Sequence, residues 1–165
     1  ALVALAGTAL TFGMWWVYFV LPAAPILHAH KELAFGFGYG HIVIFGAIVA
    51  TGAGLHTAAY YIEHQSTLDS AQTILTVAVP VAVYILAIFV LYTYLVRTID
   101  AFHLLLLAGS GAVLVAAVLL ASVGVPMSVC LLVVTLAPIV VVVGYEFIGH
   151  RHAADAIGAA LSQEL

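Results

Sequence analysis

Long apolar runs, separated by short breaks, fill almost the whole chain. A run of about 18 or more apolar residues is long enough to cross the hydrocarbon core of a bilayer as a helix. The pattern therefore predicts five membrane-spanning helices, at residues 1–21, 37–62, 71–96, 102–123 and 127–148. The expected fold class is all-α, a multi-pass transmembrane helical bundle.

The breaks between the runs carry residues that end helices. Pro22 and Pro25 follow the first run, and polar residues follow the second and third. Only Gly124–Pro126 separates the last two runs, which predicts a tight hairpin and makes these two helices antiparallel neighbours. Because unpaired backbone is costly in lipid, a helix is the form that such runs must take.

Composition agrees with a bilayer as the surrounding solvent. Apolar residues make up 66% of the chain and charged residues 6%, against about a quarter charged in a soluble domain. We expect residues 1–165 to form one transmembrane domain. The net charge of −4 provides no basic surface, so nucleic acid is excluded as a partner.

Sequence motifs give no support to an enzyme. The chain contains no glycine-rich phosphate loop, no HExxH metal motif and no serine in a nucleophile elbow. The single cysteine, Cys130, excludes an internal disulfide. We expect a protein without catalytic activity.

The positions of the basic residues predict an orientation. With five crossings, the first loop, the third loop and the tail at 149–165 share one side of the membrane. All three cationic residues, Lys31, Arg97 and Arg151, fall there. Positive charge is retained on the cytoplasmic side, so the C-terminus is predicted to be cytoplasmic.

Three segments resemble a known family. They are WWVYF at Trp15–Phe19, GYGHIVIFGAIVATGAGL at Gly38–Leu55, and VVVGYEFIGHR at Val141–Arg151. In order and spacing they are similar to the C-terminal half of the low temperature requirement A (LtrA) family. Two positions depart from the family pattern, since Val20 and His56 stand where acidic residues are usual.

The resemblance implies a multi-pass protein of the bacterial inner membrane, from a family named for a growth requirement in the cold. It also implies that this chain, which opens at Ala1 within an apolar run, is a piece of something longer. A further helical half, a second copy of the chain or another membrane protein is therefore expected as a partner, beside the lipid bilayer.

The predicted helix at 37–62 has two unusual faces. Gly46, Ala50 and Gly54 recur at four-residue spacing, a small-residue stripe that allows another backbone to approach closely. The opposite face carries His41 and His56. Because neither face suits lipid, we expect this helix to be central in the bundle.

The histidines allow two interpretations. His41 and His56 are 15 residues apart, about 22 Å along a helix, a spacing that suits two stacked haems. Only His103 offers a matching ligand for His41, so haem is an alternative and no cofactor or metal is predicted. In the simpler interpretation, His41 lies at the start of a helix, where it is either hydrated at the membrane interface or bonded to a neighbouring carbonyl group.

A polar cluster is predicted at the cytoplasmic end of the last two helices. Arg97, Asp100 and His103 begin one helix, and Glu146 and His150 end the other. A carboxylate beside a histidine at the interface can relay protons. The same groups can instead form an ion-pair cluster that fixes the helix ends.

Two prolines fall near the middle of predicted helices. Pro80 and Pro138 each remove one backbone hydrogen bond, freeing the carbonyl groups of Thr76 and Val134. Such residues kink membrane helices. In some transporters, broken helices of this kind also line a binding site.

These features support a leading functional hypothesis and two alternatives. The leading hypothesis is transport or sensing of a small ion or solute, linked to stress or growth in the cold, with His41, His103 and Glu146 as interior polar groups. One alternative is a structural or assembly subunit that packs through the Gly46 stripe. The other is a haem-binding electron-transfer protein.

Overall fold

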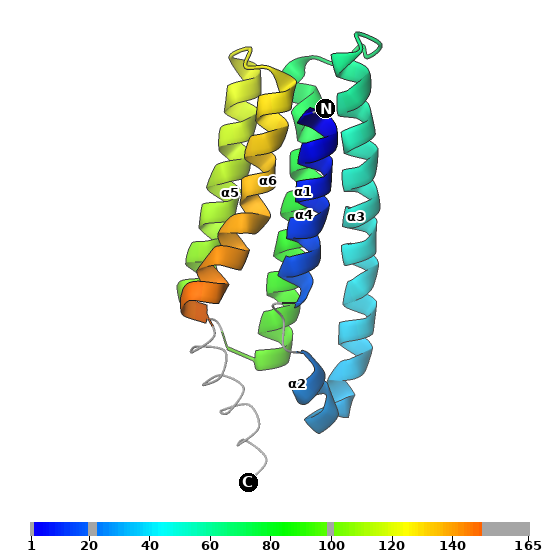
Figure 1. Ribbon diagram of the computed structural model, residues 1–165. Coiled ribbons are helices and arrows are strands. Elements are labelled where there is room, and N and C mark those ends of the chain that lie inside the picture. Colours follow the sequence, from blue (N-terminus) through cyan, green and yellow to red (C-terminus); the bar gives the residue numbers. More distant parts are fainter. Residues whose placement is uncertain (1, 20–22, 99–100, 150–165) are drawn as a thin grey trace.

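The computed structural model describes residues 2–19, 23–98 and 101–149, which form a bundle of long helices lying side by side (Figure 1). The long helices are α1 (Leu2–Phe19), α3 (Ala34–Ile62), α4 (Ser70–Val96), α5 (Ala101–Ser122) and α6 (Met127–Gly144). The shorter elements are α2 (Ala23–Ala29), a 3-10 turn at Lys31–Leu33 and a π-helical turn at Tyr145–Gly149. These described ranges contain no strand, so the all-α prediction is confirmed.

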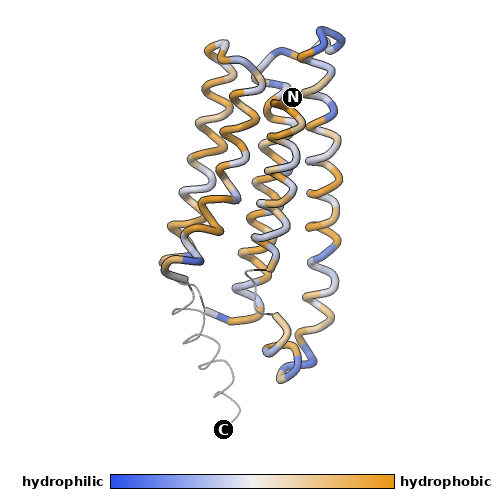
Figure 2. The backbone as a smooth tube through the Cα atoms, in the orientation of Figure 1, coloured by the Kyte–Doolittle hydropathy of each residue, from blue (hydrophilic) through white to orange (hydrophobic). Residues whose placement is uncertain are grey.

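Five helical segments of the described chain are long and apolar enough to cross a membrane, as the sequence predicts. Hydrophilic residues gather at the two ends of the bundle, and apolar residues cover its length (Figure 2). Large apolar side chains such as Phe45, Val49 and Leu105 remain exposed along the helices. Lipid chains are the environment in which such a surface is stable.

The ends of the helices differ from the prediction mainly around the first loop. The second spanning helix begins at Ala34 instead of residue 37, and α2 precedes it where no helix was predicted. Pro25 is compatible with α2 because it lies in the first turn, where a backbone N–H has no partner within the helix.

Side chains and backbone conformation fix the other helix ends. A capping box starts α4: Asp69 Oδ1 accepts a hydrogen bond from Gln72 N at 2.7 Å, and Gln72 Oε1 accepts one from Asp69 N at 3.1 Å. Gly124 adopts a φ of +85° in the turn between α5 and α6. A residue with this φ reverses the chain after a helix, and the predicted antiparallel hairpin is confirmed (Figure 1).

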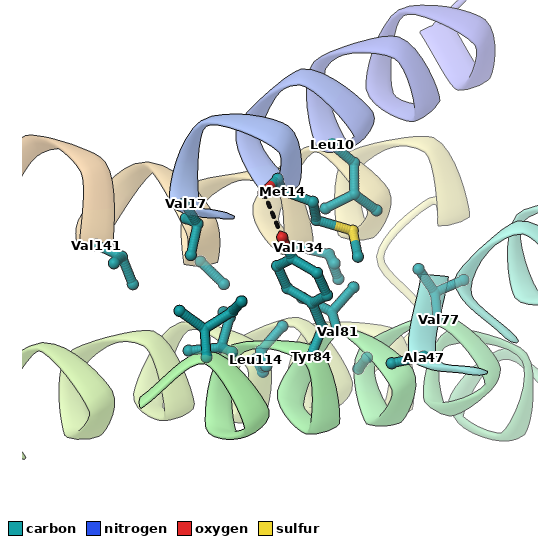
Figure 3. Close-up of a cluster of buried hydrophobic side chains, with 14 of the residues drawn as sticks. Leu10, Met14, Val17, Ala47, Val77, Val81, Tyr84, Leu114, Val134 and Val141 are labelled. Atoms are coloured by element: carbon teal, nitrogen blue, oxygen red, sulfur yellow. Dashed lines mark hydrogen bonds between the residues drawn. The ribbon is translucent and has the colours of Figure 1, made fainter. Parts of the chain in front are cut away.

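The most central helix is α4, which contacts α1, α3, α5 and α6. Tyr84 of α4 is buried with Met14 of α1 and Val134 of α6, among other apolar side chains (Figure 3). The predicted central position of the helix at 37–62 is wrong: α3 packs mainly against α4 and lies at the edge of the bundle (Figure 1).

Candidate functional site

The face that α3 turns toward α4 is built from small and apolar residues. Its buried positions are Ile44, Ala47, Thr51, Gly54 and Ala58. Near the start of the helix, Gly36 and Gly40 lie against the side chains of Tyr94 and Leu91. Close helix packing of α3 therefore exists, but on a set of residues other than the predicted stripe.

The predicted small-residue stripe does not lie on that packing face as a unit. Gly54 contacts α4, but Gly46 and Ala50 are exposed on the outer side of α3. A Cβ added at Gly46 would meet no atom within 4 Å in the described structure. The physical reason is rotation: at about 100° per residue, positions eight apart differ by about 80° around the helix.

Gly54 meets α4 at the carbonyl group that Pro80 leaves free. Pro80 has no N–H to donate to the Thr76 oxygen, and this oxygen lies where a Cβ at position 54 would stand. The single proton of the Thr76 hydroxyl is shared between Thr73 O, at 2.7 Å, and the more distant Gly54 carbonyl, at 3.4 Å. A glycine therefore allows α3 to pack on the backbone irregularity of α4.

The second proline also lies against a glycine. A Cβ added to Gly13 of α1 would stand 2.9 Å from Cγ of Pro138 in α6. Nearby, Ser110 of α5 donates to the carbonyl of Ala137 at 3.0 Å. Pro80 and Pro138 thus lie within α4 and α6 at helix contacts.

A cleft of about 420 Å³ lies between α1 and α3 and is the main candidate site. Trp15 and Tyr18 of α1 and Phe45 and Ile48 of α3 form its walls, and Tyr84 of α4 forms its floor. Pockets that hold small molecules have volumes of roughly 300–1,000 Å³. The lining residues of α3 and α4 lie in the middle of their helices, whereas Tyr18 lies near the end of α1, so the cleft runs from the depth of the bilayer core toward one end of the bundle.

Tyr84 is placed in the floor by a buried hydrogen bond. Its hydroxyl donates to the carbonyl of Met14 at 2.6 Å, joining α4 to α1 (Figure 3). A tyrosine within a long apolar run must satisfy its hydroxyl group when it is buried. That requirement was the available signal in the sequence, although the partner helix could not be read from it.

One end of the cleft is bridged by His41 and Tyr18. His41 Nδ1 lies 2.7 Å from Phe37 O, and His41 Nε2 lies 2.8 Å from the Tyr18 hydroxyl. Because a carbonyl can only accept, Nδ1 carries the proton of the neutral ring, and Nε2 accepts from Tyr18. His41 is half-buried, and its bond to a neighbouring carbonyl matches the simpler interpretation of this residue.

This bonding argues against His41 as a haem ligand. Both ring nitrogens of His41 are engaged, and His103 lies on α5 while α4 packs between α3 and α5 (Figure 1). In the described ranges, no three His, Cys, Asp or Glu side chains gather where they could hold a metal ion. The residues therefore do not fit a haem held between His41 and His103.

His56 was predicted to be an interior polar residue, and this prediction is wrong. The side chain is exposed on the surface of α3, where it packs edge-on against Tyr60 with ring centroids 4.6 Å apart. The face of the helix explains the exposure, because His56 lies on the side of α3 opposite the buried residues Gly54 and Ala58.

His103 is buried, as expected for an interior polar group. Its ring stacks on Tyr92 of α4, with centroids 4.2 Å apart and an interplanar angle of 24°. Both residues, together with Tyr145, line a cavity of about 20 Å³, roughly the space of one water molecule. This histidine is held by aromatic packing between α4 and α5.

Glu146 lies on the exposed surface of the chain instead of in its interior. Its Oε1 accepts a hydrogen bond from Trp16 Nε1 of α1 at 3.3 Å. Trp16 belongs to the WWVYF segment and Glu146 to the segment VVVGYEFIGHR. The sequence did not predict that these two segments are in contact. The π-helical turn at Tyr145–Gly149 carries Glu146 at the end of α6.

The remaining predicted residues concern topology and the polar cluster. Lys31 and Arg97 lie at the same end of the bundle, where α2 packs near the end of α4 (Figure 1). Asp100, His150 and Arg151 lie outside the described residues.

Residues 1–138 match the model of the family described as bacterial low temperature requirement A protein (LtrA). No curated protein and no solved structure matches the chain.

Proposed function

Since the chain belongs to the bacterial low temperature requirement A (LtrA) family and is a multi-pass membrane protein, we propose that it binds a small solute in the cleft between α1 and α3, as a step in moving or sensing that solute. The observation that carries the proposal is the cleft itself, which combines ligand-sized volume with a mainly apolar lining. A solute dissolved in the bilayer can reach such a site directly.

The lining favours an apolar solute over a small inorganic ion. The described residues that line the cleft include no charged side chain. An ion in the bilayer core would have to exchange its water shell for compensating protein groups, and charged groups in such positions are normally paired. Aromatic and aliphatic side chains supply contacts for an apolar molecule instead.

The Tyr18–His41 hydrogen bond lies at the end of the cleft that is nearer to the membrane surface. It joins α1 to α3 where the first loop connects them, at the end of the bundle that carries Lys31 and Arg97. A solute that separates α1 from α3 would strain this bond. We propose that this end is cytoplasmic, in the bacterial inner membrane, and that the activity supports growth in the cold. The role requires no covalent chemistry.

Tryptophan fluorescence provides the test, because one of the two tryptophans lines the cleft. In the Trp16→Phe variant, Trp15 is the only reporter. The protein in lipid nanodiscs is titrated with decanol brominated at the end of its chain, which quenches a tryptophan on contact. We expect saturable quenching of Trp15 above the linear quenching due to partitioning into lipid.

Two matched glycine substitutions locate the binding. A Cβ added at Gly52, which lines the cleft, would meet no atom within 4 Å, and the same holds for Gly46 on the outer side of α3. Gly52→Phe should fill the cleft and remove the saturable component, whereas Gly46→Phe should retain it. Absence of saturation in the parent variant, or its survival in Gly52→Phe, would refute the proposal.

A second candidate function rests on the outer face of α3. Gly46 and Ala50 leave that face shallow and exposed, a surface on which a helix of another protein or a second copy can pack closely. In this case the protein is an assembly subunit. Gly46→Phe would then dissociate a complex isolated from the native membrane, and Gly52→Phe would leave the complex intact.

A further inference from the structure

The hydroxyl groups that line the cleft share one property: each is paired with an acceptor inside the protein. The pairs are Thr11 Oγ1 with Gly7 O at 2.8 Å, Thr51 Oγ1 with Ala47 O at 2.8 Å, Tyr18 Oη with His41 Nε2 at 2.8 Å, and Tyr84 Oη with Met14 O at 2.6 Å. A hydroxyl has one proton to donate and two lone pairs. With the proton used, what it can offer a ligand is an acceptor.

The two tyrosines hold this arrangement most firmly. The Tyr84 bond is buried and joins α4 to α1, and the Tyr18 bond joins α1 to α3. If either tyrosine hydroxyl donated its proton to a ligand instead, the hydrogen bond between the two helices would be lost. Inside a membrane such a loss is costly, because water is not available to replace the donor.

The walls add a preference of charge. Trp15, Tyr18 and Phe45 present aromatic rings, whose faces attract cations and repel anions. No lysine or arginine is among the described residues of the lining, so a carboxylate would have no counter-charge. An ammonium group would lack a counter-charge as well, but the aromatic rings and the hydroxyl lone pairs of the lining attract a cation.

We infer that the cleft selects apolar molecules that carry a hydrogen-bond donor, an alcohol or an amine, over carboxylates and over molecules without a donor. This inference rests on the proposed function, since it names the class of solute that the same cleft takes. It follows from the direction of four hydrogen bonds, whereas the proposed function follows from volume and apolar lining.

Four probes with the same brominated ten-carbon chain separate the head groups: an alcohol, a primary amine, a methyl ether and a carboxylate. Each is titrated into the Trp16→Phe protein in nanodiscs at neutral pH, and saturable quenching of Trp15 gives a dissociation constant. Because a typical hydrogen bond contributes about 1 kcal/mol, the ether should bind about 5-fold more weakly than the alcohol. The carboxylate should bind more than about 10-fold more weakly.

A pair of threonine variants tests the hydroxyl acceptors themselves. Thr51 and Thr57 both donate to the carbonyl four residues earlier on α3, at 2.8 Å and 3.0 Å, but only Thr51 lines the cleft. Thr51→Val should reduce the preference for the alcohol over the ether to about 2-fold, since one acceptor is lost. Thr57→Val should keep the original ratio.

The outcomes separate the two claims. Saturable binding of all four probes with equal constants would overturn the inference and leave the proposed function standing. Tighter binding of the carboxylate would also overturn it. Loss of saturation for every probe would refute the proposed function as well. If Thr51→Val fails to fold, Thr11→Val offers the same comparison from α1.

Discussion

Gly54 of α3 lies directly against the carbonyl oxygen of Thr76 in α4, the acceptor that Pro80 deprives of its usual N–H. The glycine hydrogen that replaces a Cβ points at this oxygen, the arrangement of a weak C–H···O hydrogen bond. The backbone irregularity that Pro80 causes in α4 thus lies against a residue of α3 that has no side chain.

This contact predicts a strong effect of a single methyl group. Gly54→Ala should lower the free energy of unfolding by about 2 kcal/mol, because backbone atoms of α4 cannot move aside as a side chain can. The measurement is unfolding by SDS in mixed micelles. As the control, Gly46→Ala on the same helix should change stability by less than about 0.5 kcal/mol. Equal effects of the two variants would contradict the close approach at Gly54.

Gly13 and Pro138 should be energetically coupled. A Cβ at position 13 would press on the proline ring, so Gly13→Ala alone should cost about 1 kcal/mol in the same unfolding assay. In a Pro138→Ala background the ring is absent, and the cost should fall by more than about 0.5 kcal/mol. Additive losses in the double variant would show that the two residues do not interact.

The His41 ring should be found in one tautomer. Its bond to Phe37 O requires a proton on Nδ1, which leaves Nε2 to accept from Tyr18. Nitrogen NMR of the labelled protein should show a protonated Nδ1 and a bare Nε2 in the neutral ring. Tyr18→Phe should shift only the Nε2 resonance. A proton on Nε2 in the neutral ring would exclude the bridge as described.

The proposed orientation can be tested with single cysteines on two exposed loop residues. Glu32 lies in the first loop and Gln65 in the second, at opposite ends of the bundle. Glu32→Cys should react with a membrane-impermeant maleimide in inverted vesicles, and Gln65→Cys in intact cells. Cys130 is fully buried and should stay unlabelled in both. The reverse pattern would place the first loop outside the cell.

Hydropathy was sufficient to predict the spanning helices, because lipid permits only one backbone form and the signal repeats along each run. It missed α2, which is too short to show a periodic pattern and contains Pro25. It also misplaced the packing face of α3. A four-residue repeat drifts around the helix, whereas the buried positions from Ile44 to Ala58 alternate three and four residues and stay on one side.

The candidate site could be predicted only in part. His103 was expected in the interior and is buried there, but its aromatic neighbours come from contacts between α4 and α5. The cleft draws its lining from three helices, and no sequence pattern states which helices enclose a space. Tyr18 and Tyr84 became informative only when their partners, His41 and Met14, were known.

The central position of α4 has a consequence for biosynthesis. As the ribosome extends the chain, α1 and α3 enter the membrane first, and the helix on which α3 mainly packs has not yet been made. Release of α4 from the translocon is then the event that gathers the earlier segments. Until that moment, the face of α3 that carries Ile44, Thr51 and Gly54 lacks the helix that covers it in the finished bundle.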